Sequence, residues 1–497
     1  MPLPSYCQSV PLLNCRAGEN QSARYYRFPF SVPAGCGKLT VEMDINSAKS
    51  AQIPLILFDS KGKVRLMRAA NATIGAAHTQ YTITPEKADQ GCIPGPLPAG
   101  EWKLLLYKRR MFEDIEARLT ISFVPACEMP PETQIENAAV QALRRRPFSL
   151  DCPDGRPGWY CGELHTHSSE STGHTSLREV VEAARNEHID FLALTDHFTA
   201  SHWLRLQEIH DGKRPLLLQS VEISGDFGHA NVHGLKEWQN PLVDNNEEVT
   251  KFLGLARQPD MEAIADEAHR EGALFCINHA LSGVMGWRYR NFPLEKADLY
   301  EVFCTPEMQT SFLYTTHWDL FLTRGLRLTG VGSSDSHHPT QEGPWKLGRV
   351  RTWVYADSLS QIDILRALKR GHAYVGIEGA RMDFHAVCAG RIAHMGDTLA
   401  LAAGETARFE LDLAAHPRGN LFLYADGMIL DTIYYDQAGS DQYIFELPAS
   451  WIQKSGLSYV RIEFHEMTEP PRFYGMAYRD YRSARLISNP IWLQRKE

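Results

Sequence analysis

The sequence lacks any apolar run that approaches the roughly 18 residues a helix needs to span a bilayer. Its first residues, "MPLPSYCQSVPLLNC", also lack the basic start and the long apolar segment of a secretion signal. No internal repeat and no low-complexity tract is present. We therefore expect a globular, cytoplasmic protein that does not contact membranes.

An excess of positive charge is also missing, because the 497 residues carry a formal net charge of -9 at pH 7. General binding of nucleic acids or anionic membranes needs a basic face, so neither partner is expected. No CxxC pair is present, so the sequence does not support a zinc knuckle. Seven of the ten cysteines fall in the first 161 residues, which would suit disulfides in an exported protein, but without a signal we expect reduced thiols.

The patterns that are present divide the chain into four sections. Residues 1–130 show short alternating strands separated by Gly, Pro and Asn turns, which predicts a β-sandwich domain. Residues 131–157 are polar and contain proline, as an exposed linker does. Residues 158–378 alternate apolar strands with helical periodicity, which predicts an α/β domain with a parallel sheet, open or closed into a barrel. Residues 379–497 return to strands alone and predict a second β-sandwich-like domain.

Histidines gather in the α/β section. Fourteen of the twenty lie between residues 161 and 338, twice the number that an even spread would place there. Polar residues repeatedly close an apolar strand in this section: His165 and His167, Asp196 and His197, Glu222, His279, and Asp335 and His337. Because the carboxyl ends of parallel strands form the active face of such a sheet, we expect these side chains to converge.

Spacing indicates that these residues bind metal. Side chains two apart on a strand point the same way, so His165 with His167, and Asp335 with His337, can each hold one ion. Imidazole and carboxylate together suit zinc, manganese or iron, and a carboxylate such as Glu222 can bridge two ions. The candidates would overfill a mononuclear site, so we predict two or three divalent metal ions.

Taken in order, these segments resemble a known family. "LHTHS", "LTDH", "SVEIS" followed by "GHANVHG", "INHA" and "SSDSHH" are similar to the metal-binding motifs of the polymerase and histidinol phosphatase (PHP) superfamily. The resemblance implies a distorted (β/α)7 barrel over residues 158–378. The flanking β-domains make the chain similar to the carbaryl-hydrolase-like (CehA/McbA) branch of that superfamily. These outer domains resemble the branch only in their strand-rich sequence pattern and in a few turns.

The resemblance also implies roles for single residues. His165 and His167 correspond to the first-metal pair, Glu222 to the bridging carboxylate, and Asp335 and His337 to the carboxylate and histidine of the last motif. His197, His229 and His279 occupy the remaining ligand positions. The family commonly has an aspartate in the turn after the first motif, where this chain reads Ser171, Thr172 and Gly173. Either Glu170 or His174 replaces that ligand, or one metal site is altered; His233 is either a further ligand or a supporting residue.

Other residues in this section are candidates for catalysis and substrate binding. His197 is the first candidate to protonate a leaving group, and Asp196 either supports the neighbouring imidazoles or caps the next turn. Arg288, Arg290 and Arg351 either receive an anionic substrate or are solvated loop charges. Aromatic residues in the same loops either line a pocket for an aromatic leaving group or pack the loops.

Three functions follow from these observations. We favour a metal-dependent hydrolase that cleaves a small-molecule phosphomonoester or phosphodiester, as the superfamily implies. The branch resemblance allows a carbamate or aryl ester hydrolase instead. The third alternative is a non-catalytic ligand-binding protein with an inert barrel. The sequence does not predict an oligomeric state.

Overall fold

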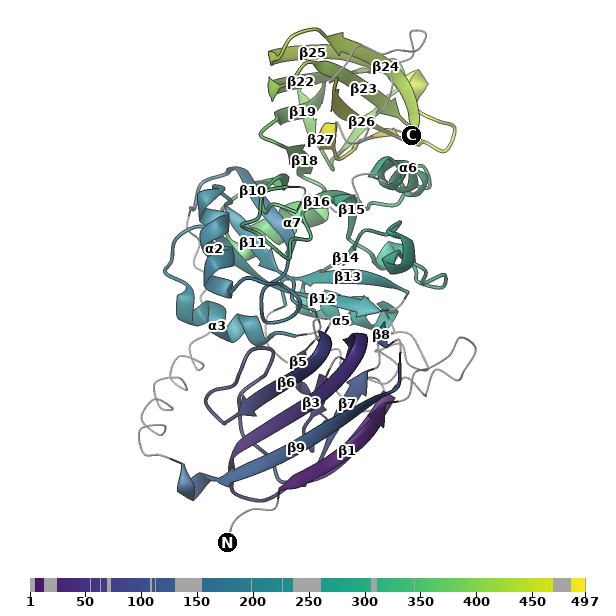
Figure 1. Ribbon diagram of the computed structural model, residues 1–497. Coiled ribbons are helices and arrows are strands. Elements are labelled where there is room, and N and C mark those ends of the chain that lie inside the picture. The colour runs from purple at the N-terminus through teal and green to yellow at the C-terminus, as the bar shows by residue number, and fades with distance from the viewer. Residues whose placement is uncertain are drawn as a thin grey trace.

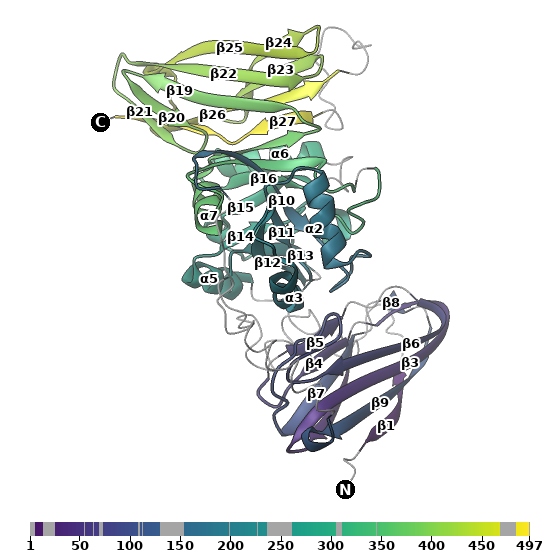
Figure 2. The same cartoon turned by 90° about the vertical axis from the view of Figure 1, so that its left-hand side faces the viewer.

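The computed structural model describes residues 5–12, 25–129, 154–235, 261–304, 311–467 and 484–496, except residues 54, 63, 69–72, 108–109, 112, 198, 226 and 344. Three parts follow one another along the molecule, with the N-terminal sheets at one end, a mixed α/β part in the middle and the C-terminal sheets at the other end (Figure 1, Figure 2). Of the predicted linker at 131–157, residues 131–153 lie outside the described residues.

Two antiparallel sheets build the N-terminal part. The first contains β1 (Tyr6–Leu12), β9 (Ile115–Pro125), β3 (Cys36–Gln52) and β6 (Thr73–Ile83), in that order, with β8 (Arg110–Met111) also paired to β3. The second contains β2 (Tyr25–Val32), β7 (Gly100–Tyr107), β4 (Leu55–Phe58) and β5 (Val64–Arg68). Side chains of both sheets share one apolar core. The alternating sequence of this part therefore folds into two layers over a common core.

Seven strands of the central part follow one another in the sheet in chain order. They are β10 (Gly158–Thr166), β11 (Phe191–Leu194), β12 (Leu216–Gly225), β13 (Gly228–His233), β14 (Leu274–Ile277), β15 (Leu299–Cys304) and β16 (Thr329–Ser333). A parallel bridge joins Thr166 to Ser336, and the backbone N–H of His167 donates to the Ser336 carbonyl at 2.9 Å. The ends of the first and last strands of this series therefore meet.

The expected alternation of strand and helix holds only in part. The helices of the described residues are α2 (Leu177–Asn186), α3 (Ser201–Ile209), α5 (Met261–Glu271), α6 (Ser311–Leu322) and α7 (Gln361–Arg370). Apolar residues three and four apart predict helices at residues 176–188, 260–272, 315–325 and 358–371, which correspond to all of these except α3. β12 and β13 form a hairpin without a helix between them, so β13 runs antiparallel to both of its neighbours. The (β/α)7 barrel that the resemblance implies is therefore not confirmed, because the described part has few helices.

Local sequence explains where α2 begins. Ser176 accepts a hydrogen bond from the backbone N–H of Glu179, and the Glu179 side chain in turn accepts one from the backbone N–H of Ser176. This reciprocal arrangement caps two of the unpaired amide groups of the first turn. One face of the helix then buries Leu177, Val180 and Val181 against the sheet. α7 is likewise capped by Ser360 and ends at Gly371, whose φ of 81° is left-handed.

The remaining strands of the described residues follow β16. The bounds are β17 (Val350–Ala356), β18 (Ala373–Ile377), β19 (Arg381–Cys388), β20 (Arg391–His394), β21 (Thr398–Leu401), β22 (Thr406–His416), β23 (Gly419–Ala425), β24 (Met428–Tyr435), β25 (Gly439–Pro448), β26 (Leu457–Glu466), β27 (Ala484–Ser488) and β28 (Ile491–Arg495). β18 pairs with both β17 and β27, so hydrogen bonding runs from the central sheet into the C-terminal sheet without a break. β19, β20, β22 and β25 make a separate antiparallel sheet.

The three parts share a core rather than meeting only at linkers. One apolar cluster contains Ile56 and Met67 of the N-terminal sheets, Trp203 and Ile223 of the central part, and Trp492 near the C-terminus. In the part of the chain that the structure describes, no helix is long and apolar enough to cross a membrane. The domain boundaries expected from the sequence stay predictions.

Candidate metal centre

The strand ends bring the candidate ligands together. His165 is the next-to-last residue of β10, and His167 is the first residue after this strand. Both imidazoles are fully buried. Asp335 and His337 follow β16, which the Thr166 to Ser336 bridge holds beside β10. His197 follows β11 and forms a parallel bridge with Glu222 of β12. The prediction that these segments converge at one end of the sheet therefore agrees with their placement.

Donor atoms in this region form three overlapping groups in which all ligand atoms lie within 4.8 Å of one another. The groups are His165, Glu222 and His279; His165, His167 and Asp335; and His167, His197 and His337. Because two histidines are shared between groups, the three groups form one continuous cluster. These clusters of histidine and carboxylate can bind divalent metal ions.

Glu222 lies at the middle of the cluster. Its carboxylate oxygens lie 2.7 Å from His197 Nδ1 and 3.1 Å from His229 Nδ1. Three further imidazole nitrogens approach it, those of His167 at 3.4 Å, His165 at 3.5 Å and His279 at 3.7 Å. A carboxylate with two oxygens facing five imidazoles is placed to bridge more than one ion.

Asp335 is the second carboxylate of the cluster. Its side chain approaches Nε2 of His167 at 3.0 Å, Nε2 of His165 at 3.3 Å and Nδ1 of His337 at 3.7 Å. The backbone φ of Asp335 is 46°, in the left-handed region that aspartate tolerates better than most residues. This turn aims the carboxylate back toward β10, so the strained residue is also one that meets the ligands.

Sequence reasoning missed Glu301, which supports the cluster from β15. Its Oε1 accepts from Nδ1 of His165 at 2.8 Å and from the Ser333 hydroxyl, and its Oε2 accepts from the backbone N–H of His279 at 2.7 Å. Since a carboxylate accepts from Nδ1, the Nε2 of His165 is turned toward Glu222 and Asp335. The available signal was a carboxylate inside the apolar run "LYEVFC".

Asn278 is a second residue that sequence reasoning missed. Its Nδ2 donates to Glu222 Oε1 at 3.1 Å, and its Oδ1 accepts from the backbone N–H of Asn231 at 3.1 Å. Both asparagines are buried. Asn278 therefore ties the central carboxylate to β13, and only its position beside His279 in "INHA" pointed to it.

Several buried donor atoms suit a bound cation. Among the described residues, His165 Nε2, His167 Nδ1 and His279 Nδ1 have no hydrogen-bond partner. Leaving buried polar atoms unpaired costs free energy, and coordination would satisfy those that face the cluster. The mixture of imidazole nitrogen and carboxylate oxygen is the donor set of zinc, manganese and iron sites. The residues therefore fit divalent metal ions.

Protonation states also suit metal binding. Burial lowers the pKa of His167 to about 3 and that of His229 to about 4, so both imidazoles are neutral at pH 7. Burial would raise the pKa of Glu222, but His197, His165 and His229 outweigh it and hold that pKa well below its usual range. In His165 burial acts to lower the pKa, but the carboxylates of Asp335, Glu301 and Glu222 raise it overall. The carboxylates thus favour positive charge at this position.

The three additional ligand candidates lie outside these groups. The Glu170 carboxylate faces Gly91, Ser201 and Arg205. His174 stacks on His338 with ring centroids 4.2 Å apart. His233 is buried on β13, and its Nδ1 lies 3.0 Å from the hydroxyl of its cross-strand partner Ser220, two register positions from the pair of Glu222 and Asn231. None of the three joins a donor group within the described residues.

Asp196 and Arg351 are also placed away from the cluster. The Asp196 carboxylate accepts from the Ser168 N–H at 2.9 Å, the Ser168 hydroxyl at 2.6 Å and the Ser171 hydroxyl at 2.5 Å. It therefore organises the loop after His167, while His197 itself contacts Glu222. Arg351 donates to the Gly348 carbonyl at 2.6 Å, and its Nη2 lies 3.5 Å from the carboxylate of Glu187, the residue that follows α2. The alternation of side chains along β17 turns it outward.

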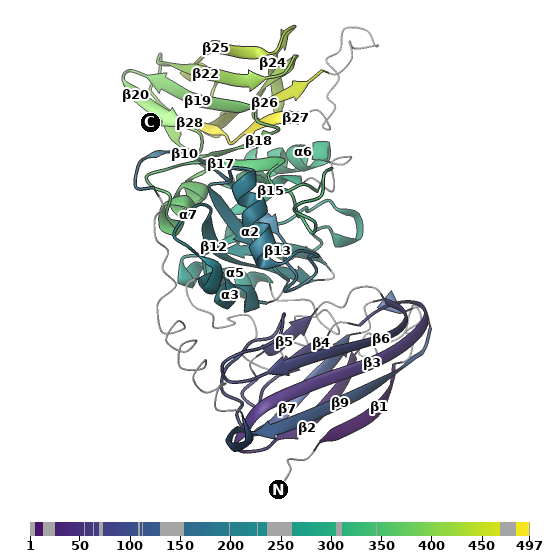
Figure 3. The same cartoon turned by 60° about the vertical axis from the view of Figure 1, so that its left-hand side comes forward.

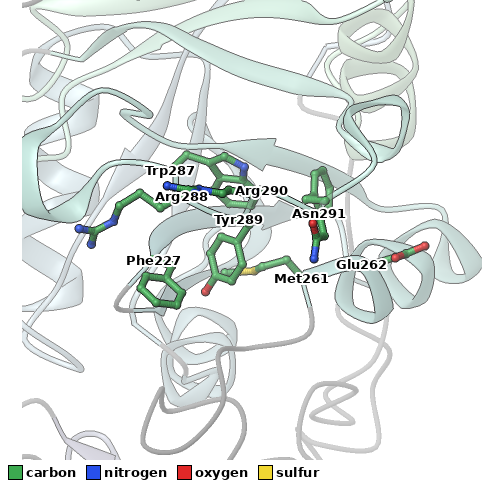
Figure 4. A pocket seen from close by; sticks show the side chains of 9 residues that line it. Phe227, Met261, Glu262, Trp287, Arg288, Tyr289, Arg290 and Asn291 are labelled. Atoms are coloured by element: carbon green, nitrogen blue, oxygen red, sulfur yellow. The ribbon is translucent and has the colours of Figure 1, made fainter.

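Arg288 and Arg290 line a cavity of about 680 Å³ (Figure 4). Figure 4 shows Phe227, Trp287 and Tyr289 gathered in one region of it and Glu262 farther along. The cavity walls continue from two cluster segments, because Phe227 shortly precedes His229 and the loop from His279 leads to Trp287. Where a Cβ on Gly228 would stand, the Trp287 Cα lies only 2.8 Å away, so the two walls touch.

No protein-family model matches the chain, and no curated protein matches it. Solved structures similar to it include a two-domain protein from Bacteroides vulgatus that contains a predicted PHP-like metal-dependent phosphoesterase. It is 17% identical over 67% of this chain and 96% of that chain, with a TM-score of 0.36. An amidohydrolase from Chromobacterium violaceum is 16% identical over 36% of this chain and 88% of that chain, with a TM-score of 0.27.

Proposed function

We propose that this protein is a metal-dependent hydrolase that cleaves a small-molecule phosphomonoester or phosphodiester. The observation that carries the proposal is the convergence of five imidazoles within 4.0 Å of the buried Glu222 carboxylate, with Asp335 beside four of the cluster histidines. Sites that place two metal ions close together are used by phosphatases and nucleases.

The residues that would hold the ions are His165, His167, His197, Glu222, His229, His279, Asp335 and His337. When bound, two or three ions of manganese, zinc or iron would lower the pKa of water toward about 7 and offset negative charge at the reacting phosphoryl group. Glu301 keeps Nε2 of His165 turned toward the centre, and Asn278 holds Glu222 by its Oε1. The chain itself thus supplies a rigid and mostly water-excluded site.

Where His197 holds no ion, we propose that it delivers the proton to the leaving group, because an imidazole nitrogen bound to a metal carries no transferable proton. The side chains of His197 and His337 keep 13% and 29% of their exposure, whereas those of His165 and His167 are fully buried. A group that donates a proton to a departing alcohol must reach both the substrate and solvent. His197 meets both requirements and has Glu222 at 2.7 Å to orient its ring.

The proposal includes a PHP-type barrel for the central part. Its support is the series of seven strands whose first and last members meet at the Thr166 to Ser336 bridge. The motifs that carry the resemblance lie at the ends of these strands, except "GHANVHG", which spans β13. The assignment to the carbaryl-hydrolase-like branch stays a prediction.

A second candidate function is hydrolysis of an aryl ester or carbamate, and the aromatic lining of the cavity that contains Arg288 and Arg290 favours it. Phe227, Trp287, Tyr289 and Phe292 line that cavity, so an aromatic leaving group would find ring surfaces there. Arg288 and Arg290 of the same cavity suit an anionic group instead. The two functions differ in which of these residues the substrate uses.

Initial rates on four substrates test the proposal: 4-nitrophenyl phosphate, bis(4-nitrophenyl) phosphate, 4-nitrophenyl acetate and a naphthyl N-methylcarbamate. Each is measured with manganese-loaded and metal-stripped full-length protein. We expect metal-dependent turnover of the phosphates, and preference for the acetate and carbamate would support the second candidate. Bound metal without turnover of any substrate would favour an inert ligand-binding protein.

Variants connect any turnover to the cluster. His165→Ala and Asp335→Ala should each lower both metal content and turnover, because each residue belongs to a donor group. His385→Ala is the matched control, since this histidine lies on β19 of the C-terminal part, outside all donor groups of the described residues. Full activity in either cluster variant would contradict the assignment.

A further inference from the structure

The four residues after His167 form a loop that is held from inside the central part. Ser168, Glu170 and Ser171 are buried, with 0%, 1% and 2% of their surface exposed. Asp196 accepts from Ser168 and Ser171, and the backbone N–H of Glu170 donates to the Ser168 hydroxyl at 3.1 Å. The loop is therefore fixed on the side that faces the sheet.

Glu170 fixes the opposite side of this loop. Its Oε2 accepts from the Gly91 N–H at 2.9 Å and from the Ser201 hydroxyl at 2.8 Å, and its Oε1 lies 3.0 Å from Nε of Arg205. Gly91 belongs to the N-terminal part, whereas Ser201 and Arg205 belong to α3. In all views α3 lies at the edge of the central part that faces the N-terminal sheets (Figure 1, Figure 3). The carboxylate thus joins three separate segments.

Further contacts join the same loop to the N-terminal part. Gln90 Nε2 donates to the Ser169 hydroxyl at 2.9 Å, and the Arg68 guanidinium donates to the Ser169 carbonyl. Arg205 Nη2 also donates to the Ala88 carbonyl at 2.7 Å. Residues 68 and 88–91 therefore clamp residues 169 and 170 directly and through α3.

Close packing at Gly91 shows how tightly these surfaces fit. The φ of Gly91 is 74°, and a Cβ there would lie 2.9 Å from the Met67 carbonyl oxygen and 3.2 Å from the Glu170 carbonyl oxygen. Only glycine combines this backbone conformation with such an approach. The N-terminal part is thus in backbone contact with the segment that carries the first pair of histidines.

We infer that Glu170 is a positioning residue through which the N-terminal β-sheets hold His167 in place and thereby set the metal affinity of the cluster. His167 is two peptide bonds from Ser169, so a shift of the clamped loop moves the imidazole. Ligands must be held within about 0.5 Å of their productive positions to bind an ion well. The inference rests on the proposed metal centre, and it gives the N-terminal part a role in the site.

The test measures the Kd for Mn²⁺ of the full-length protein by competition with a chelator, together with thermal unfolding in the presence and absence of Mn²⁺. We expect Glu170→Ala to weaken Mn²⁺ binding by about 10- to 100-fold, the usual effect of losing a residue that supports a ligand. Glu170→Gln should lie between the wild type and Glu170→Ala, because an amide keeps one acceptor oxygen. Glu182→Ala, which removes an exposed glutamate of α2, is the matched control and should bind like the wild type.

Thermal unfolding separates positioning from a purely structural role. A contact that only stabilises the interface lowers the melting temperature equally with and without Mn²⁺ and leaves Kd unchanged. A positioning role also reduces the stabilisation that Mn²⁺ adds, because that stabilisation depends on Kd. Unchanged Kd in folded Glu170→Ala overturns the inference.

Arg68→Ala and Gln90→Ala provide a second route if Glu170→Ala does not fold. Both side chains contact Ser169 from the N-terminal part, and neither belongs to a donor group of the described residues. We expect the double variant to weaken Mn²⁺ binding as well, and a wild-type Kd in that variant overturns the inference. If the wild type binds neither Mn²⁺ nor Zn²⁺, the proposed function itself is wrong and the inference fails with it.

Discussion

Glu301→Gln is the change that probes the support of the cluster most directly. Glu301 is 2% exposed, and its two oxygens accept from three donors: Nδ1 of His165, the Ser333 hydroxyl and the backbone N–H of His279. Glutamine has nearly the same shape but only one acceptor oxygen. The substitution therefore keeps the packing and removes half of the acceptors.

The size of the effect follows from the orientation of the amide. If its oxygen faces His165, its NH₂ group faces the His279 N–H, and that buried donor loses its partner. Such a loss costs about 1–3 kcal/mol of the free energy of unfolding. If the amide turns over, Nδ1 of His165 loses its acceptor and the imidazole is no longer fixed with Nε2 toward the cluster. Either way we expect metal affinity to fall by about 10- to 100-fold, or about 1.4–2.7 kcal/mol.

Two measurements are needed, a chelator competition titration with Zn²⁺ or Mn²⁺ and urea unfolding of the metal-free protein. Glu295→Gln is the control, because this glutamate is exposed in the short 3-10 helix η4 (Leu294–Lys296) that precedes β15. Folded Glu301→Gln that binds metal with the wild-type Kd would refute the reasoning that Glu301 orients His165.

Three further predictions concern pH and stability. Burial lowers the pKa of His233 to about 3, so the unfolded state binds more protons than the folded state between about pH 6.5 and 3. The free energy of unfolding of the metal-free protein should therefore fall as pH decreases through this window. His233→Gln should reduce the slope of that free energy against pH by at most about 1.4 kcal/mol per pH unit, measured by urea unfolding at pH 7, 6 and 5. A slope equal to that of the wild type would contradict this prediction. Asp319→Ala removes a partner of the fully buried Arg461 and should cost about 3–5 kcal/mol in urea unfolding, and a loss below about 1 kcal/mol would be inconsistent with a buried ion pair. Gly91→Ala should cost about 1–3 kcal/mol because of its positive φ and the contact with Met67, and an unchanged melting temperature would argue against this tight approach.

Much of the local structure was predictable because it depends on neighbours in the chain. Apolar residues three and four apart marked α2, α5, α6 and α7, and the structure has a helix at each place. The spacing of His165 and His167 predicted that both imidazoles point the same way, and both lie in the cluster. Strand-end residues were predicted to converge because parallel strands end at one edge, a general property of such sheets.

Other features depended on contacts that periodicity does not record. β13 was not predicted as a strand, and the register of its antiparallel pairing with β12 sets Glu222 opposite Asn231. The helix α3 ("SHWLRLQEI") was not predicted either. Glu301 was missed since its carboxylate interrupts an apolar strand, and nothing near it in the chain showed that His165 lies 136 positions away as its partner.

Glu170 illustrates which properties the sequence determines and which only the tertiary structure decides. The sequence by itself determined that a carboxylate follows the first histidine pair in a turn, and this made Glu170 a candidate ligand. Only the tertiary structure decided that the carboxylate turns away from the cluster to meet Gly91, Ser201 and Arg205. The reason is physical: spacing along a chain sets which residues share a face, but the partner of a buried charge is set by packing between segments that are far apart in sequence.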